Sequence, residues 1–107
     1  MILRRITMYA KNTDQVSPVR KFVEGIYLHP MYTDVVSQLI LADGFIAKTN
    51  RMEETKEYTK FVSEVQFSDK DTFDRYFNDP SVESLYNYLE TLIISEDVEF
   101  NKEVIES

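Results

Sequence analysis

Cysteine is absent from this chain of 107 residues. Without thiols the chain has no disulfide framework, no thiolate nucleophile and no cysteine-based zinc site, so packing must stabilise the fold. Glycine and proline are scarce, with two and three residues, while hydrophobic residues make up 43% of the chain. This composition excludes a disordered or low-complexity chain and is sufficient for one core. We therefore expect residues 1–107 to form a single domain.

Long hydrophobic runs are missing as well. No segment of the sequence approaches the roughly twenty apolar residues that span a bilayer. The first residues, with Arg4 and Arg5 inside a short alternating run, lack the apolar stretch of a signal peptide. We therefore expect a soluble, cytoplasmic protein with no membrane partner.

Charge is distributed unevenly along the chain, whose net charge is −7. Residues 51–107 contain six Lys or Arg against fifteen Asp or Glu, whereas residues 1–50 contain six against four. An acidic surface repels nucleic acid phosphates and attracts basic proteins. We therefore expect no nucleic acid partner and consider a basic protein partner, with simple solubility as the alternative explanation.

The apolar pattern predicts four strands and two helical segments. Apolar residues alternate with period two over residues 2–9, 61–67 and 98–104, and a shorter strand is predicted over 45–49. The charged residues 51–57 are predicted to connect two strands as a hairpin with extended arms. Helical spacing begins after Ser17 and again after Ser68, where a capping box with Asp71 is expected.

Each helical segment is broken by a proline, and the two breaks are alike. The apolar residues that follow Pro30 and Pro80 have the same offsets from these prolines, namely Val35, Leu39 and Ala42 in one half and Leu85, Leu89 and Leu92 in the other. The pattern indicates a duplicated strand-helix-strand unit and the order β-α-β-β-α-β. It predicts an α+β, ferredoxin-like fold, in which a four-stranded antiparallel sheet carries both helices on one face.

The other face of this sheet would be left uncovered. We expect it to mix apolar with polar side chains, namely Leu3, Tyr9, Val62 and Phe45 with Arg5, Glu64, Gln66 and Asn101. Such a face is too apolar for open water and too polar for a dry core. We therefore expect another surface to cover it.

Residues 65–80, VQFSDKDTFDRYFNDP, are similar to the strand, helix turn and Y-x-x-D-P break of antibiotic-biosynthesis monooxygenase-like proteins. Together with the element order, which covers nearly the whole chain, they make the sequence resemble the dimeric α/β-barrel superfamily. The resemblance implies a homodimer whose subunits press their open sheet faces together around a shared cavity. Some members are oxygenases or isomerases that use no cofactor, so it implies none here.

Known catalytic motifs are absent from the sequence. No nucleotide-binding loop, metalloprotease helix or serine hydrolase motif appears, so we assign no catalytic residue. The single histidine, His29, precedes Pro30 and is interpreted as a cap or turn residue. Enzymes of the resembling superfamily often have a cavity-facing histidine in the second half, where the aligned position here is Asp79. The acidic pairs lie in predicted loops or helix starts, so no metal site is expected.

RNA-recognition domains have the same element order, so residues 60–67 were compared with their stacking strand. Lys60, Val65 and Phe67 match, but the glycine and the exposed stacking aromatics are replaced. The acidic charge also opposes phosphate binding, which excludes RNA recognition.

The sequence is compatible with three functions. The leading prediction is a small acidic homodimeric interaction or regulatory module without catalytic activity, whose partner surface comprises Tyr88, Glu83, Glu90, Glu96 and Asp97. The first alternative is a cofactor-independent monooxygenase or isomerase acting on a small hydrophobic substrate, in a cavity under the sheet lined by Arg5, Tyr9, Glu64 and Asn101. The second alternative is an acidic DNA mimic or viral accessory protein that binds a basic host protein.

Glu64 has two interpretations. With Glu103 it could form a carboxylate pair that acts as a general base in the cavity. The simpler interpretation is an ion pair between Glu64 and Arg5 or Arg4 on a neighbouring strand.

Overall fold

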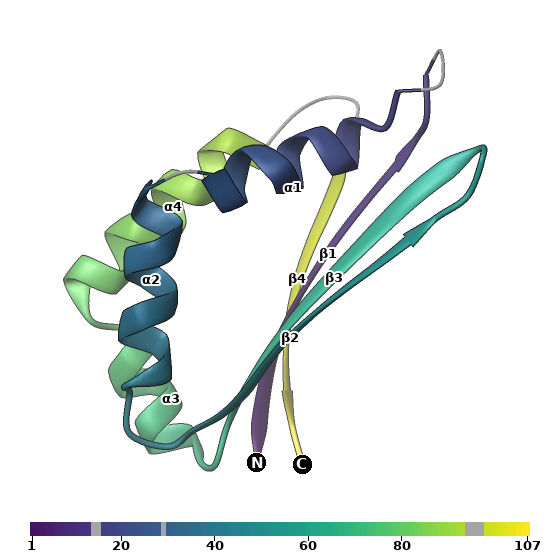
Figure 1. The fold of residues 1–107 in the computed structure, drawn as a ribbon. Coiled ribbons are helices and arrows are strands. Elements are labelled where there is room, and N and C mark those ends of the chain that lie inside the picture. The colour runs from purple at the N-terminus through teal and green to yellow at the C-terminus, as the bar shows by residue number, and fades with distance from the viewer. Residues whose placement is uncertain (14–15, 29, 94–97) are drawn as a thin grey trace.

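The computed structural model describes residues 1–13, 16–28, 30–93 and 98–107 (Figure 1). The described strands form one sheet in the order β2-β3-β1-β4, and neighbouring strands are antiparallel. The helices lie on one face of this sheet, so the predicted ferredoxin-like α+β fold is confirmed. In chain order the elements are β1 (Ile2–Lys11), α1 (Pro18–Leu28), α2 (Pro30–Ile40), β2 (Phe45–Glu54), β3 (Tyr58–Phe67), α3 (Lys70–Phe77), α4 (Pro80–Ile93) and β4 (Glu99–Glu106).

The prolines divide each helical segment into two helices. Pro30 is the first residue of α2, and Pro80 is the first residue of α4. A proline at this position costs no helical hydrogen bond, because the first N–H groups of a helix have no partner inside it. Asp79 caps α4, since its Oδ1 accepts hydrogen bonds from the backbone N–H groups of Ser81 at 2.9 Å and Val82 at 3.3 Å. The predicted breaks are confirmed.

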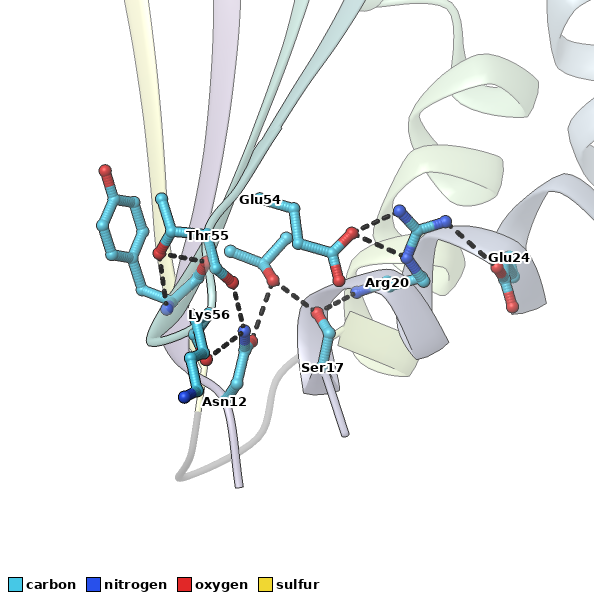
Figure 2. Close-up of polar contacts among 9 residues, drawn as sticks. Asn12, Ser17, Arg20, Glu24, Glu54, Thr55 and Lys56 are labelled. Atoms are coloured by element: carbon cyan, nitrogen blue, oxygen red, sulfur yellow. Dashed lines mark hydrogen bonds and ion pairs between the residues drawn. The ribbon is translucent and has the colours of Figure 1, made fainter. Parts of the chain in front are cut away.

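Ser17 both caps α1 and ties it to the sheet (Figure 2). Its Oγ accepts a hydrogen bond from the backbone N–H of Arg20 at 3.1 Å and donates one to Thr59 Oγ1 at 2.7 Å. Thr59 donates in turn to Asn12 Oδ1 at 2.9 Å, and the Asn12 amide donates to the carbonyl of Thr55 at 2.9 Å. Because Thr59 is fully buried, these hydrogen bonds replace the water that its hydroxyl loses on folding.

The cap of α3 differs from the prediction. Asp69, rather than Ser68, is the N-cap residue, and its carboxylate accepts a hydrogen bond from the backbone N–H of Thr72 at 2.9 Å. This hydrogen bond holds the pKa of the Asp69 carboxyl below its usual value. Ser68 instead donates its hydroxyl to Asp69 Oδ2 at 3.3 Å. The capping box of Ser68 with Asp71 was therefore wrong by one residue.

Most of the charged connection predicted over residues 51–57 belongs to β2. β2 continues to Glu54 and β3 begins at Tyr58, so the charged residues lie mainly in strand arms, as the prediction allowed. At the turn, the backbone N–H of Thr55 donates to the carbonyl of Tyr58 at 2.8 Å. The arms extend beyond the helical layer in Figure 1. Charged side chains are accommodated there because no helix buries them.

Gly44 lies between α2 and β2 with φ of +78°. This left-handed conformation favours glycine. A Cβ at this position would also overlap the side chain of Thr72 at the start of α3. Glycine is therefore favoured in this connection, which begins after α2 ends at Ile40.

The core between helices and sheet consists of two separate clusters. Phe67 lies at the centre of the first cluster, where rings from β2 and α3 surround it. Phe45 belongs to this cluster, with its ring centroid 6.2 Å from that of Phe67, so its expected place on the open face was wrong. A bulge between Phe45 and Ala47 shifts the register there. Met8 and Phe61 belong to the second cluster, which also contains buried residues of α1, namely Val19 and Val23.

Candidate active site

A pocket of about 90 Å³ lies between the two core clusters, on the face of the sheet that the helices cover. A cavity of about 150 Å³ holds one benzene ring, so this pocket encloses a short chain or part of a ring, and the rest of a larger ligand would extend out of it. Most of the lining is apolar, as is usual for ligand sites. The apolar residues are Ile6, Met8, Val23, Ile26, Val35, Val36, Phe61 and Val65, and the polar residues are Arg4, Tyr32, Lys48, Asn50, Ser63, Tyr86 and Glu90.

The strand residues at the centre of the sheet explain why space remains there. Asn50, Ser63 and Ile6 lie side by side on β2, β3 and β1. Ser63 is a small residue between Phe61 and Val65, which are its neighbours on the same face of β3. Figure 1 shows α1 crossing one end of the sheet while α2 turns along it. The middle of the sheet therefore receives less apolar volume than either end.

A polar cluster lines one side of the pocket. Lys48 Nζ donates hydrogen bonds to Tyr32 OH at 3.1 Å and to Asn50 Oδ1 at 2.9 Å. Ser63 Oγ donates to the same Asn50 oxygen at 2.8 Å. Lys48 Nζ also lies 5.4 Å from the centroid of the Tyr32 ring. Among the described residues, no carboxylate forms an ion pair with Lys48, so its ammonium is held by neutral groups.

Arg4 lines the opposite side of the pocket and is buried. Its guanidinium carbon lies 4.8 Å from the centroid of the Phe77 ring and 4.7 Å from that of Tyr86. Arg4 Nη2 donates to Glu90 Oε1 at 3.2 Å, and the same oxygen accepts a hydrogen bond from Lys102 Nζ at 3.0 Å. Burial lowers the pKa of the Arg4 guanidinium, while Tyr86 and Glu90 oppose this shift. The Glu90 carboxylate therefore binds both Arg4 and Lys102.

Two tyrosines beside Arg4 are difficult to ionise. Burial raises the pKa of the Tyr76 hydroxyl far above its usual value, and the nearby Tyr86 adds to this shift. Burial also raises the pKa of the Tyr86 hydroxyl, although the hydrogen bond with Tyr76 and the charge of Arg4 lower it. Both tyrosines therefore remain neutral near neutral pH and act here as packing and hydrogen-bonding groups.

The residues predicted to line a cavity lie on the open face of the sheet. Arg5 and Tyr9 on β1, Glu64 on β3 and Asn101 on β4 share this face. Arg5 forms ion pairs with two carboxylates. Its Nη2 lies 3.7 Å from Glu64 Oε2, and its Nη1 lies 3.9 Å from Glu103 Oε1. The predicted ion pair between Glu64 and Arg5 is confirmed. None of these residues lines the pocket described above, and their place in a shared cavity stays a prediction.

Sequence reasoning missed Lys48, Asn50 and Ser63. Their signal was present in the strand alternation, because helix-facing positions of a sheet are usually apolar and these three residues are not. Ser63 alternates with Phe61 and Val65, so it lies on the helix-facing side of β3 and lines the pocket. The short predicted β2, ending at residue 49, excluded Asn50 from the sheet altogether.

The residues predicted to form an acidic partner surface have different surroundings. Glu83 and Tyr88 are exposed on α4. Glu90 instead turns toward the sheet, where it binds Arg4 and Lys102 and its side chain is only 18% exposed. Glu96 and Asp97 lie outside the described residues, as does His29.

The described residues contain neither a membrane-spanning helix nor a metal-binding cluster. None of the helices there combines the length and apolar character needed to cross a membrane. In the same part of the chain, histidine and carboxylate side chains form no group of three or more that could hold a metal ion.

No protein-family model matches the chain, and no curated protein matches it in sequence. Many solved structures are similar to it in fold, and they include the following three. SnoaB, a cofactor-independent oxygenase from Streptomyces nogalater, has 12% identity and a TM-score of 0.56 in a mutant form, over 99% of this chain and 92% of that chain. A monooxygenase of Streptomyces coelicolor in complex with nanaomycin D has 15% identity and a TM-score of 0.56. The similarity covers 98% of this chain and 88% of that chain.

The third similar structure is a dimeric ferredoxin-like protein from an uncultured marine organism. It has 13% identity and a TM-score of 0.54, over 100% of this chain and 90% of that chain. These similarities confirm the predicted ferredoxin-like fold.

The leading functional prediction is corrected by these comparisons. A non-catalytic interaction module was expected, but proteins that share the fold over nearly the whole chain include an oxygenase and a monooxygenase. The prediction failed because it was based on the exposed acidic residues of the second half. It did not consider a pocket on the helix-facing side of the sheet.

Proposed function

We propose that this chain is a cofactor-independent monooxygenase that acts on a small hydrophobic substrate in the pocket between the helices and the sheet. The observation that carries this proposal is the position of Lys48 on an otherwise mainly apolar lining, with neutral oxygens as its partners. The oxygenases among the similar structures support the same reaction class.

The proposed substrate is a carbon acid, with a CH₂ group next to a carbonyl or an equivalent conjugated oxygen. Loss of a proton from the CH₂ group to water leaves an enolate, whose negative charge lies largely on the oxygen. A fixed ammonium at the wall of a mainly apolar pocket stabilises such a charge as it develops. We assign this role to Lys48, positioned by Tyr32 and Asn50.

The enolate then supplies the electrons for dioxygen. A C–O bond forms between the substrate carbon and O₂, and a proton from water completes a hydroperoxide. Loss of water breaks the O–O bond and leaves a carbonyl where the CH₂ group was. One oxygen atom of O₂ ends in the product and the other in water, so no reductant besides the substrate is needed.

Oxygen uptake by the purified full chain, with chelator present, tests this proposal. The substrates are one- and two-ring ketones with an activated CH₂ group, beginning with 2-indanone, and isotopically labelled O₂ identifies the new carbonyl oxygen. We expect enzyme-dependent uptake that Lys48→Met lowers about a hundredfold, the usual cost of losing one such stabilising group. Lys21→Met, the same change at an exposed residue of α1, is the matched control.

Two results would contradict the proposal. Absence of uptake across the panel would exclude the oxygenase reaction for these substrates. Exchange of the CH₂ hydrogens with solvent deuterium without oxygen uptake would instead indicate an isomerase, because deprotonation would then be followed by reprotonation.

We further propose that two copies of the chain associate through their open sheet faces. This face includes Leu3 and Tyr9, which are half-buried, among charged residues. Val62 lies on the same face and is buried in the single chain. The similar dimeric ferredoxin-like protein supports the association of two copies. Arg5, Tyr9, Glu64 and Asn101 would then lie at the contact between the copies.

A further inference from the structure

The lining of the pocket is cationic, although the chain has a net charge of −7. Arg4 and Lys48 line the pocket, and Lys102 reaches its wall from β4. Glu90 is the carboxylate that lines this pocket in the described part of the chain. These residues together leave an excess of positive charge at the site, opposite in sign to the protein as a whole.

Lys48 carries part of this excess charge, because no carboxylate in the described part of the chain forms an ion pair with it. Glu90 Oε1 is bound by both Arg4 and Lys102, at 3.2 and 3.0 Å. Lys48 lies in the same cross-strand row as Arg4, with Val65 between them, so their strands are about 10 Å apart. The carboxylate that balances Arg4 is therefore engaged on the far side of the pocket from Lys48.

We infer that the pocket selects an anion, namely one apolar ring or short chain with a single ionised carboxylate held at Lys48. The apolar part would contact Ile6, Met8 and Phe61, which line the same space. A charged carboxylate binds an ammonium more strongly than a neutral amide does, and an apolar surrounding increases the difference. The inference rests on the proposed function only for the choice of this pocket as the substrate site.

Benzoate and benzamide form the test pair, because they have nearly the same shape and differ in charge. Their affinities for the full chain are measured by calorimetry and by chemical-shift titration, which also identifies the residues that respond. We expect benzoate to bind about tenfold more tightly than benzamide, the difference typical of a charge-assisted hydrogen bond. The largest shifts should come from Lys48, Ser63 and their neighbours, and added salt should weaken benzoate alone.

Variants at Lys48 separate charge from shape. Lys48→Met retains the length of the side chain without its charge, and should bring the two affinities within about twofold of each other. Lys48→Arg keeps the charge and should keep the preference for benzoate. Lys21→Met, on the exposed surface of α1, should behave as the unmodified chain does.

Equal affinities in the unmodified chain, absence of binding by either compound, or a preference that survives Lys48→Met would each overturn the inference. The oxygen-uptake assay has an independent outcome. Benzoate selection without oxygen uptake by any ketone would contradict the proposed function and support this inference. Oxygen uptake in a chain that does not prefer benzoate would do the reverse.

Discussion

Arg4 on β1 and Glu90 on α4 form an ion pair of 3.2 Å at the wall between the central pocket and a groove beside β4. The two residues are 86 positions apart in the sequence. Lys102 binds the same carboxylate oxygen from the edge strand. One acidic side chain thus connects α4 to both β1 and β4, at the place where the two core clusters do not meet.

Replacement of Glu90 by glutamine should therefore destabilise the fold. The Arg4 and Glu90 side chains are only 9% and 18% exposed, and removal of one partner leaves a buried charge without compensation. We expect the free energy of unfolding in urea to fall by about 3 kcal/mol, at the lower end for a broken buried pair.

Glu83→Gln is the matched control, since Glu83 is exposed on the same helix. It should change the free energy of unfolding by less than about 0.5 kcal/mol. The double variant Arg4→Met with Glu90→Leu should recover much of the loss, because it removes both charges together. Equal effects of Glu90→Gln and Glu83→Gln would show that the pair does not stabilise the fold.

Sequence patterns predicted the layers of this molecule because each layer depends on local chemistry. Period-two alternation marks the strands, while Pro30 and Pro80 mark the helix starts whatever the tertiary contacts are. The hairpin arms were less clear, since side chains such as Arg51 and Glu53 lie beyond the helices and show no apolar alternation. The short predicted β2 follows from that missing signal.

The pocket could not be predicted in the same way. Its existence depends on how far the helices stand from the sheet, which the alternation of residues does not report. The open face attracted attention because its mixture of Arg5, Tyr9 and Glu64 was unusual for an exposed surface. A polar residue such as Lys48 on the covered face was the stronger signal, but the bulge between Phe45 and Ala47 breaks the alternation that would assign its face.

Loss of the Ser17 hydroxyl should weaken the attachment of α1. Ser17→Ala removes the cap from Arg20 N–H and leaves the fully buried Thr59 without one of its partners. We expect a fall of about 1–2 kcal/mol in the free energy of unfolding, measured in urea. Ser37→Ala, at an exposed serine within α2, is the control and should have little effect. A loss no larger than that of Ser37→Ala would contradict the role of the network shown in Figure 2.

High pH should destabilise the protein through Tyr76. Burial raises the pKa of its hydroxyl in the folded state, while the unfolded chain ionises near its ordinary value of about 10. Below that pH both states are neutral and the stability is fully present. Above it the unfolded state loses protons first, so the free energy of unfolding falls as pH rises.

Unfolding in urea at about pH 8 and about pH 11 measures this dependence on either side of the ordinary tyrosine pKa. The stability of Tyr76→Phe should fall less between the two pH values than that of the unmodified chain. Tyr88→Phe, at a residue that is 43% exposed, should leave the dependence unchanged. A Tyr76→Phe variant with the same pH dependence as the unmodified chain would contradict the assignment.

Association of two chains through the open face can be broken by one added charge. Thr7 lies in the central row of this face, between Val62 of β3 and Asn101 of β4. In a two-fold interface each substitution occurs twice, so Thr7→Arg buries two unpaired cations near Arg5 of each copy. We expect light scattering after gel filtration to give the mass of two chains for the unmodified protein and of one for Thr7→Arg, both at micromolar concentration.

The matched control is Ser37→Arg, which adds the same side chain to the exposed surface of α2 and should leave the mass at two chains. Far-UV circular dichroism should be the same for all three proteins, because neither position is in the core. An unmodified protein with the mass of one chain would contradict association itself. A Thr7→Arg variant that keeps the mass of two chains would instead assign the contact to another surface, and Arg5, Tyr9, Glu64 and Asn101 would then lie outside it.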